Sequence, residues 1–143
     1  MPVTVERVVA VSDEVAEALV RLIPQLNPSL TGPSRDLLER VVTDPDVTLL
    51  VARADRGIVG TATVGVIATP TWVNAHVNDV VVEEGVRGRG VGRELMEEAI
   101  RVARERGAQV VRLTSAERRA DAHRLYESLG FRHTGSRAYR LDL

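Results

Sequence analysis

The sequence contains no lysine, and all 19 of its basic residues are arginine. Without lysine the protein has no Schiff-base former, no amine nucleophile and no cation for a nucleotide-binding P-loop. It also contains no cysteine. This excludes disulfides, thiolate catalysis and cysteine-ligated metals, and no metal site is predicted.

Long apolar runs are missing as well. No stretch approaches the roughly 20 apolar residues of a membrane span. The first residues lack the charged and then apolar pattern of a signal peptide, so we expect a cytoplasmic protein without a membrane partner.

An excess of basic charge is also lacking. The arginines are balanced by 20 acidic residues, which leaves a net charge of -1. Nucleic-acid binding would need a basic excess on one face, so no nucleic-acid partner is expected. With 143 residues, of which 44% are hydrophobic and 27% charged, the chain fits one globular domain over residues 1–143.

Hydrophobic periodicity predicts mixed secondary structure. Ser12 and Asp13 begin a helix that Pro24 and Pro28 close, and a second cap region at residues 31–34 begins another. Asp55-Arg56-Gly57 indicates a tight hairpin. The predicted strands cover residues 3–11, 47–54, 58–68, 74–83 and 110–113, two short strands flank residues 134–136, and the predicted helices cover residues 13–23, 37–42, 91–106 and 119–129. The fold class is α+β, with a mixed, mostly antiparallel sheet of six to seven strands and helices on both faces.

Residues 80–92 form a strand that leads into a glycine-rich turn. A run of valines precedes three glycines within five residues, at the start of an amphipathic helix. Glycines let a ligand approach the backbone, and the first N–H groups of a helix are unpaired at its positive end. Arg87 and Arg89 add positive charge. Together these features predict a phosphate-binding turn rather than a solvated loop.

Two common nucleotide patterns do not fit this turn. A P-loop requires lysine, which is absent. The dinucleotide fingerprint G-x-G-x-x-G belongs on the first strand of a βαβ unit, whereas this turn has the spacing G-x-G-x-G and follows several earlier elements.

The same turn resembles a known family. Residues 82–92, followed by Leu95, resemble motif A of the GCN5-related N-acetyltransferases, whose R-x-x-G-x-G/A pattern is matched by Arg87, Gly90 and Gly92. A second segment resembles the family's A-x-x-x-Y-e-x-l-G-F ending. Its matching residues are Ala122, Leu125, Tyr126, Glu127, Leu129, Gly130 and Phe131. The order of elements also agrees, and the resemblance implies a V-shaped split between the fourth and fifth strands.

The resemblance implies that this split binds acetyl-CoA as a co-substrate. Residues 80–82 would offer backbone groups to the pantetheine, residues 87–92 would wrap the pyrophosphate, and residues 110–114 would line the other wall. Arg119 stands where many members carry asparagine, and residues 119–123 resemble a subgroup with R-x-x-A-H. The expected CoA-binding residues are Val80, Val81, Val82, Arg87, Gly88, Arg89, Gly90, Val91, Gly92, Arg119 and His123.

The resemblance also suggests residues for the chemistry. Tyr126 would be the general acid that protonates the CoA sulfur, because a phenol stays protonated at neutral pH. For the general base, His76 and Asp79 on the strand before the turn are both candidates. Alternation places His76 on the face of Val80 and Val82, unless a bulge switches the faces.

The expected function is acetyl-CoA-dependent N-acetylation of a primary amine, on a small molecule or a protein, by direct transfer. The alternative is a CoA-binding regulatory module with little catalysis. Acceptor specificity is expected from residues 26–36 and from residues 69–75, which include Trp72. A homodimer is compatible with either function.

Overall fold

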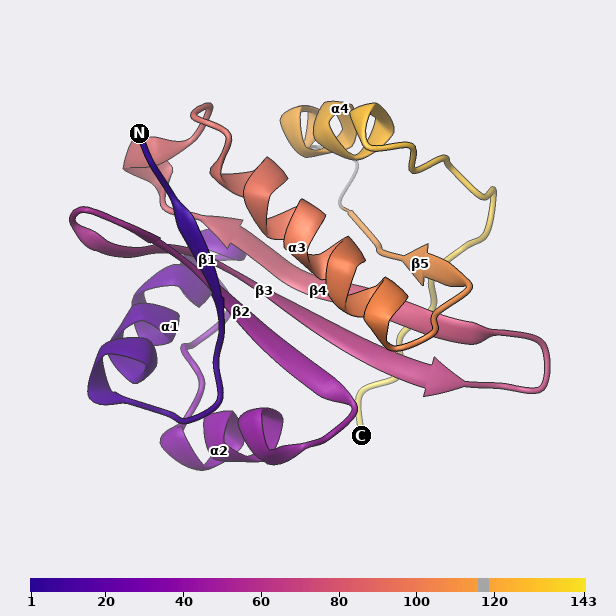
Figure 1. Ribbon diagram of the computed structural model, residues 1–143, viewed down its shortest axis with the longest axis horizontal. Coiled ribbons are helices and arrows are strands. Elements are labelled where there is room, and N and C mark those ends of the chain that lie inside the picture. The colour runs from indigo at the N-terminus through magenta and orange to yellow at the C-terminus, as the bar shows by residue number, and fades with distance from the viewer. Residues whose placement is uncertain (116–118) are drawn as a thin grey trace. The chain divides into compact units, whose positions relative to one another are not determined.

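The computed structural model describes residues 1–115 and 119–143 (Figure 1). It divides into two compact units, Met1–Arg112 and Leu113–Leu143. The first unit holds the sheet with α1, α2 and α3, and the second holds α4 (Ala120–Ser128).

One mixed sheet of five strands forms the first unit. The strands lie in the order β1-β2-β3-β4-β5, and only β4 and β5 are parallel neighbours. Their bounds are Thr4–Arg7, Val47–Ala54, Gly57–Ala68, Val73–Val82 and Val110–Arg112. The mixed, mostly antiparallel α+β architecture is confirmed. The expected number of six to seven strands is wrong, since the described residues form five.

The two strands expected near residues 134–136 account for this difference. The described residues 131–143 contain no strand, and Tyr139 and Leu141 are 89% and 83% exposed. A strand depends on hydrogen bonds from a neighbouring strand, so an apolar pattern alone does not create one.

Helix α1 (Asp13–Leu26) and helix α2 (Arg35–Thr43) both begin where serine was expected to cap them. Ser12 Oγ accepts a hydrogen bond from the Val15 N–H at 3.2 Å, and Ser34 Oγ accepts one from the Leu37 N–H at 3.1 Å. The prediction that Pro24 ends the first helix is wrong, because α1 continues through it. Proline removes one backbone donor there, while the buried apolar face of α1 holds the helix on the sheet.

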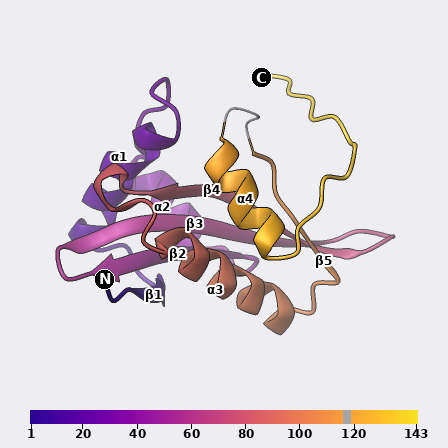
Figure 2. The same cartoon turned by 90° about the horizontal axis from the view of Figure 1, so that it is seen from above.

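Helices cover both faces of the sheet, as expected. Figure 2 shows α1 and α2 on one side of the strands and α3 (Val91–Glu105) on the other. The α1–α2 side has a cluster of buried residues that includes Leu22, Leu38, Val51 and Val81. None of the helices in the described ranges is long and apolar enough to cross a bilayer. The cytoplasmic location stays a prediction.

An ion-pair cluster joins β1 to the last turns of α3. Arg7 Nη2 donates to Glu98 Oε1 at 2.6 Å and Arg101 Nη1 donates to Glu98 Oε2 at 2.7 Å, while Arg7 also binds Glu105. The hydrogen bonds from Arg101 and then Arg7 hold the pKa of Glu98 below its ordinary value of 4.5. Glu98 therefore stabilises the fold above that pH, and this contribution is lost as the pH falls through its lowered pKa.

Glu98→Gln should therefore reduce the dependence of stability on acid pH. When the pH is lowered from 6 to roughly 3, we expect the free energy of unfolding of the variant to fall by about 1 kcal/mol less than that of the wild-type protein, as measured by urea unfolding. Glu97→Gln removes a neighbouring, 40% exposed carboxylate and is the control. Its unfolding free energy should change with pH as that of the wild-type protein does. Equal slopes for all three proteins would contradict the prediction.

Candidate active site

The pairing between β4 and β5 is short. The two strands are in register only at Asn74↔Val110, Ala75↔Val111 and His76↔Arg112. Strand β4 continues for six more residues to Val82, whereas β5 ends at Arg112. The end of β4 therefore has β3 as its only neighbour among the described strands, and its other edge has backbone groups without a strand partner.

A β-bulge interrupts β4 on this stretch. Thr61 pairs with Val81 and Thr63 with Asn78, so Asp79 and Val80 lie opposite the single residue Ala62. Asp79 has a φ of 53°. It is the only non-glycine residue in the described ranges with a positive φ. Aspartate tolerates this left-handed conformation better than most residues do.

The bulge decides which side chains of β4 share a face. Cross-strand neighbours share a face, so Asn78, opposite Thr63, and Val81, opposite Thr61, lie on the same side as His76, opposite Gly65. Val81 belongs to the cluster on the α1–α2 side. Of the two alternatives, simple alternation or a bulge that switches the faces, the register shows the bulge: the extra residue shifts the pattern by one, so His76 does not share a face with Val80 and Val82.

The glycine-rich turn follows β4 directly. Glu83 N–H donates to Val59 O at 2.8 Å, and a 3-10 turn covers Glu84–Val86. Gly88 and Gly90 have φ values of 80° and 84°, a conformation that L side chains rarely adopt. Gly90 is the N-cap of α3, and the first helical bond runs from Glu94 N–H to Gly90 O at 3.1 Å. The N–H groups of Val91 and Gly92 precede that bond and can donate to an anion.

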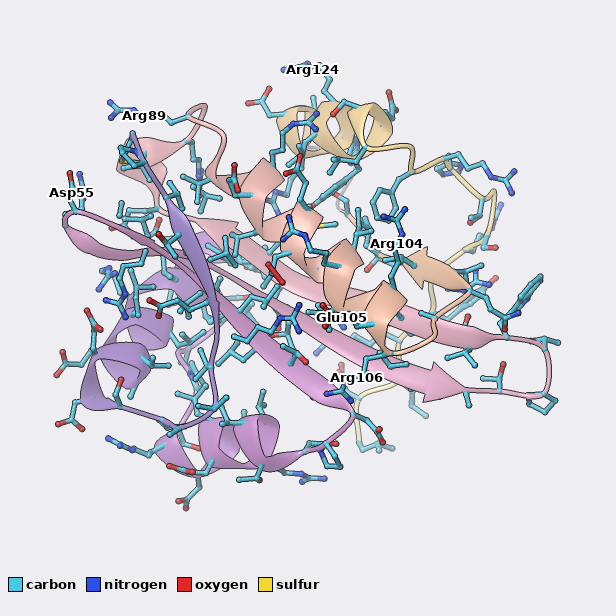
Figure 3. All side chains as sticks on the ribbon, in the orientation of Figure 1. Asp55, Arg89, Arg104, Glu105, Arg106 and Arg124 are labelled. Atoms are coloured by element: carbon cyan, nitrogen blue, oxygen red, sulfur yellow. The ribbon has the colours of Figure 1, made fainter. Side chains whose placement is uncertain are left out.

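The two arginines of the turn differ in their contacts. Arg87 Nε donates to Val82 O at 3.0 Å, so its guanidinium folds back over the end of β4. Arg89 extends outward from the turn (Figure 3). Both side chains are exposed, and both can add positive charge beside the start of α3.

Helix α1 holds the beginning of the turn. Gln25 Nε2 donates to Glu83 Oε2 at 3.2 Å, and Gln25 Oε1 accepts from the Glu84 N–H at 2.9 Å. Arg21 lies 3.5 Å from the same carboxylate and also donates to Ile58 O at 2.7 Å. Glu83 is thus an anchor of the turn. The sequence carries no signal for the role of Gln25, because 59 residues separate it from Glu84.

The second unit carries Tyr126 in α4. Its ring packs against Phe131 with a centroid distance of 6.1 Å and an interplanar angle of 64°. Burial raises the pKa of Tyr126 above its ordinary value of 10.0, and the positive charge of Arg119 offsets part of that rise. The phenol therefore holds its proton at neutral pH. Arg119 is the N-cap residue of α4, and His123 N–H donates to Arg119 O at 3.1 Å.

The structure thus brings Val80, Val81, Val82 and residues 87–92 together at one end of the first unit, beside Asp79. His76 lies three residues before Asp79 on the same strand. Arg119, His123 and Tyr126 lie together on the second unit. The described ranges contain no group of three or more histidine, aspartate or glutamate side chains that could hold a metal ion.

Comparisons with known proteins identify the family of this chain. Residues 13–131 match the Acetyltransferase (GNAT) family. A glucosamine 6-phosphate N-acetyltransferase of Trypanosoma brucei brucei is 40% identical over 68 residues, which cover 48% of this chain and 44% of that protein. The chain therefore spans less than half of that relative.

Two other matches cover most of the chain. An uncharacterized N-acetyltransferase of Mycobacterium tuberculosis is 27% identical over 141 residues, which cover 91% of this chain and 88% of that protein. A crystal structure of a transcriptional regulator from Bacillus halodurans superimposes with a TM-score of 0.87 at 25% identity, over 99% of this chain and 100% of that one. The match over residues 13–131 shows that this chain belongs to the acetyltransferase (GNAT) family.

Proposed function

We propose that the protein is an N-acetyltransferase that moves an acetyl group from acetyl-CoA to a primary amine by direct transfer. The observation that carries the proposal is the glycine turn with left-handed Gly88 and Gly90 at the start of α3. It follows the last six residues of β4, whose outer edge has no strand partner among the described residues. In this proposal the N–H groups of Val91 and Gly92, with Arg87 and Arg89, bind the pyrophosphate. The free edge of Val80 and Val82, which lies beyond the last pair of the β4–β5 ladder at His76 and Arg112, binds the pantetheine.

The proposed chemistry is direct nucleophilic attack of the amine on the thioester. The amine nitrogen attacks the thioester carbonyl, a C–N bond forms and the C–S bond breaks. Tyr126 donates its phenolic proton to the departing thiolate, a role that its raised pKa supports because the proton is retained until then. His76 and Asp79 are the two candidates that take up the amine proton. Arg119 and His123 contribute to CoA binding.

Release of CoA from acetyl-CoA in the presence of a panel of primary amines tests this proposal. We expect turnover with at least one amine, and calorimetric binding of acetyl-CoA with a micromolar Kd. The matched variant is Gly90→Val, which forces a β-branched residue into a left-handed N-cap with a φ of 84°. We expect it to weaken acetyl-CoA binding by about 10-fold or more.

A second candidate function is a regulatory module that binds CoA without catalysis. The likeness to a protein described as a transcriptional regulator favours it. Tight acetyl-CoA binding without turnover of any amine would support the module, and absence of acetyl-CoA binding would contradict both functions.

A further inference from the structure

The β3–β4 hairpin has an open polar face on the α1–α2 side. Strand β2 begins at Val47, opposite Gly65, so the hairpin continues beyond the start of β2, and there β5, paired with β4, is the only other strand beside it among the described strands (Figure 1). His76 lies directly opposite Gly65 and Asn78 opposite Thr63, on the same face. A Cβ atom added to Gly65 would have no atom of the described residues within 4 Å, so this part of the chain leaves the space above Gly65 open.

A guanidinium lies at the edge of this face. Arg112 pairs in register with His76 across the parallel β4–β5 ladder. Its Nε donates to Asn74 Oδ1 at 3.0 Å, which places the side chain on the same face as Asn74 and His76. Among the described residues it is the only hydrogen bond of the exposed guanidinium, so both terminal nitrogens can bind another acceptor. In the part of the chain that the structure describes, Arg112 forms no ion pair with a carboxylate.

The side-chain amide of Asn74 fixes the orientation of Arg112. The side chain of Asn74 is 5% exposed, one of two buried polar side chains in the described ranges. Its Nδ2 donates to Trp72 O at 3.1 Å and to Thr69 Oγ1 at 3.3 Å, so the amide cannot rotate without losing these bonds. A buried amide with both ends fixed therefore aims Arg112.

We propose that Arg112, oriented by Asn74, binds an anionic group of the amine acceptor, a phosphate or a carboxylate. This inference rests on the proposed acetyl transfer and names the class of acceptor. A guanidinium with two free terminal nitrogens matches the paired oxygens of either group. Residues 76 to 79 of β4 span about 10 Å at roughly 3.3 Å per residue. An acceptor of that length reaches from Arg112 to the bulge, where the amine meets the thioester, and His76 and Asn78 supply hydrogen bonds along the way.

Acceptors in matched pairs test the proposal. Glucosamine 6-phosphate with glucosamine is the phosphate pair, and 6-aminohexanoate with hexylamine is the carboxylate pair. We expect the anionic member of at least one pair to have a KM lower by about 10-fold or more. The pair that shows the difference identifies the anion. Equal KM values within both pairs would overturn the proposal.

Arg112→Gln removes the charge while it keeps a polar side chain. The variant should raise the KM of the anionic acceptor to that of its neutral partner, so that the difference in KM within the pair disappears. Arg104→Gln, on α3 (Figure 3), makes the same change in net charge and is the control, with wild-type KM values expected. If Arg112→Gln binds the anionic acceptor as the wild-type protein does, Arg112 is not the anion site.

The site can be tested even if no amine is acetylated. In that case glucosamine 6-phosphate and 6-aminohexanoate are titrated by calorimetry into the wild-type protein and Arg112→Gln. Binding that is lost in the variant supports the anion site and contradicts only the proposed acetyl transfer. Binding to neither protein, or equal binding to both, overturns the site.

Discussion

Tyr126→Phe is expected to lower kcat for acetyl transfer by about 100-fold, the contribution typical of one general acid. The substitution removes only the hydroxyl, so the departing thiolate must take its proton from water. The ring remains, and so does its contact with Phe131. The thermal unfolding midpoint and the KM for acetyl-CoA should therefore stay close to the wild-type values.

The pH profile separates this role from a packing role. Because burial raises the pKa of Tyr126, the loss of kcat through its deprotonation should occur above the ordinary tyrosine value of 10.0 in the wild-type protein. That loss should be absent from Tyr126→Phe. Wild-type kcat in the variant at neutral pH would show that another group protonates the thiolate.

Gly60→Val is expected to destabilise the fold by about 3 kcal/mol, measured by urea unfolding. Even a single Cβ at Gly60 would lie 3.0 Å from Leu95 Cδ1, 3.2 Å from Val91 Cγ1 and 3.2 Å from the Val81 backbone oxygen. Valine adds two methyl groups to that space, so α3 must move away from β3. Since Val91 is the first residue of α3, the glycine turn would move with it.

Gly65→Val, five residues further along the same strand, is the matched control for stability. A Cβ at that position meets no atom within 4 Å. Valine also suits a strand, so we expect a change within about 0.5 kcal/mol. Equal destabilisation by both substitutions would show that loss of glycine in β3, and not the approach of α3, is responsible.

Local chemistry in the sequence predicted much of the fold. Ser12 and Ser34 cap helices because their hydroxyls accept hydrogen bonds from N–H groups three residues on. The short connection after Ala54 forms the expected hairpin. Each of these features depends on residues close in sequence, where residue type and geometry are directly linked.

Non-local contacts caused the incorrect predictions. Pro24 does not end α1, because packing on the sheet outweighs one missing hydrogen bond. The expected strands near residues 134–136 are not formed, since pairing requires a partner strand. Alternation alone could not assign the face of His76, because the bulge at Asp79 and Val80 appears only when β4 is placed in register with β3.

The sequence by itself determined the turn at residues 87–92 and its resemblance to the acetyltransferase family, because a phosphate-binding turn needs its glycines and helix start within a few consecutive residues. Only the tertiary structure decided that Gln25 anchors this turn, that α3 packs closely over Gly60, and that Asn74 holds Arg112 beside His76. These contacts join residues 31 or more positions apart. Strand register and helix packing, which no local pattern encodes, bring them together.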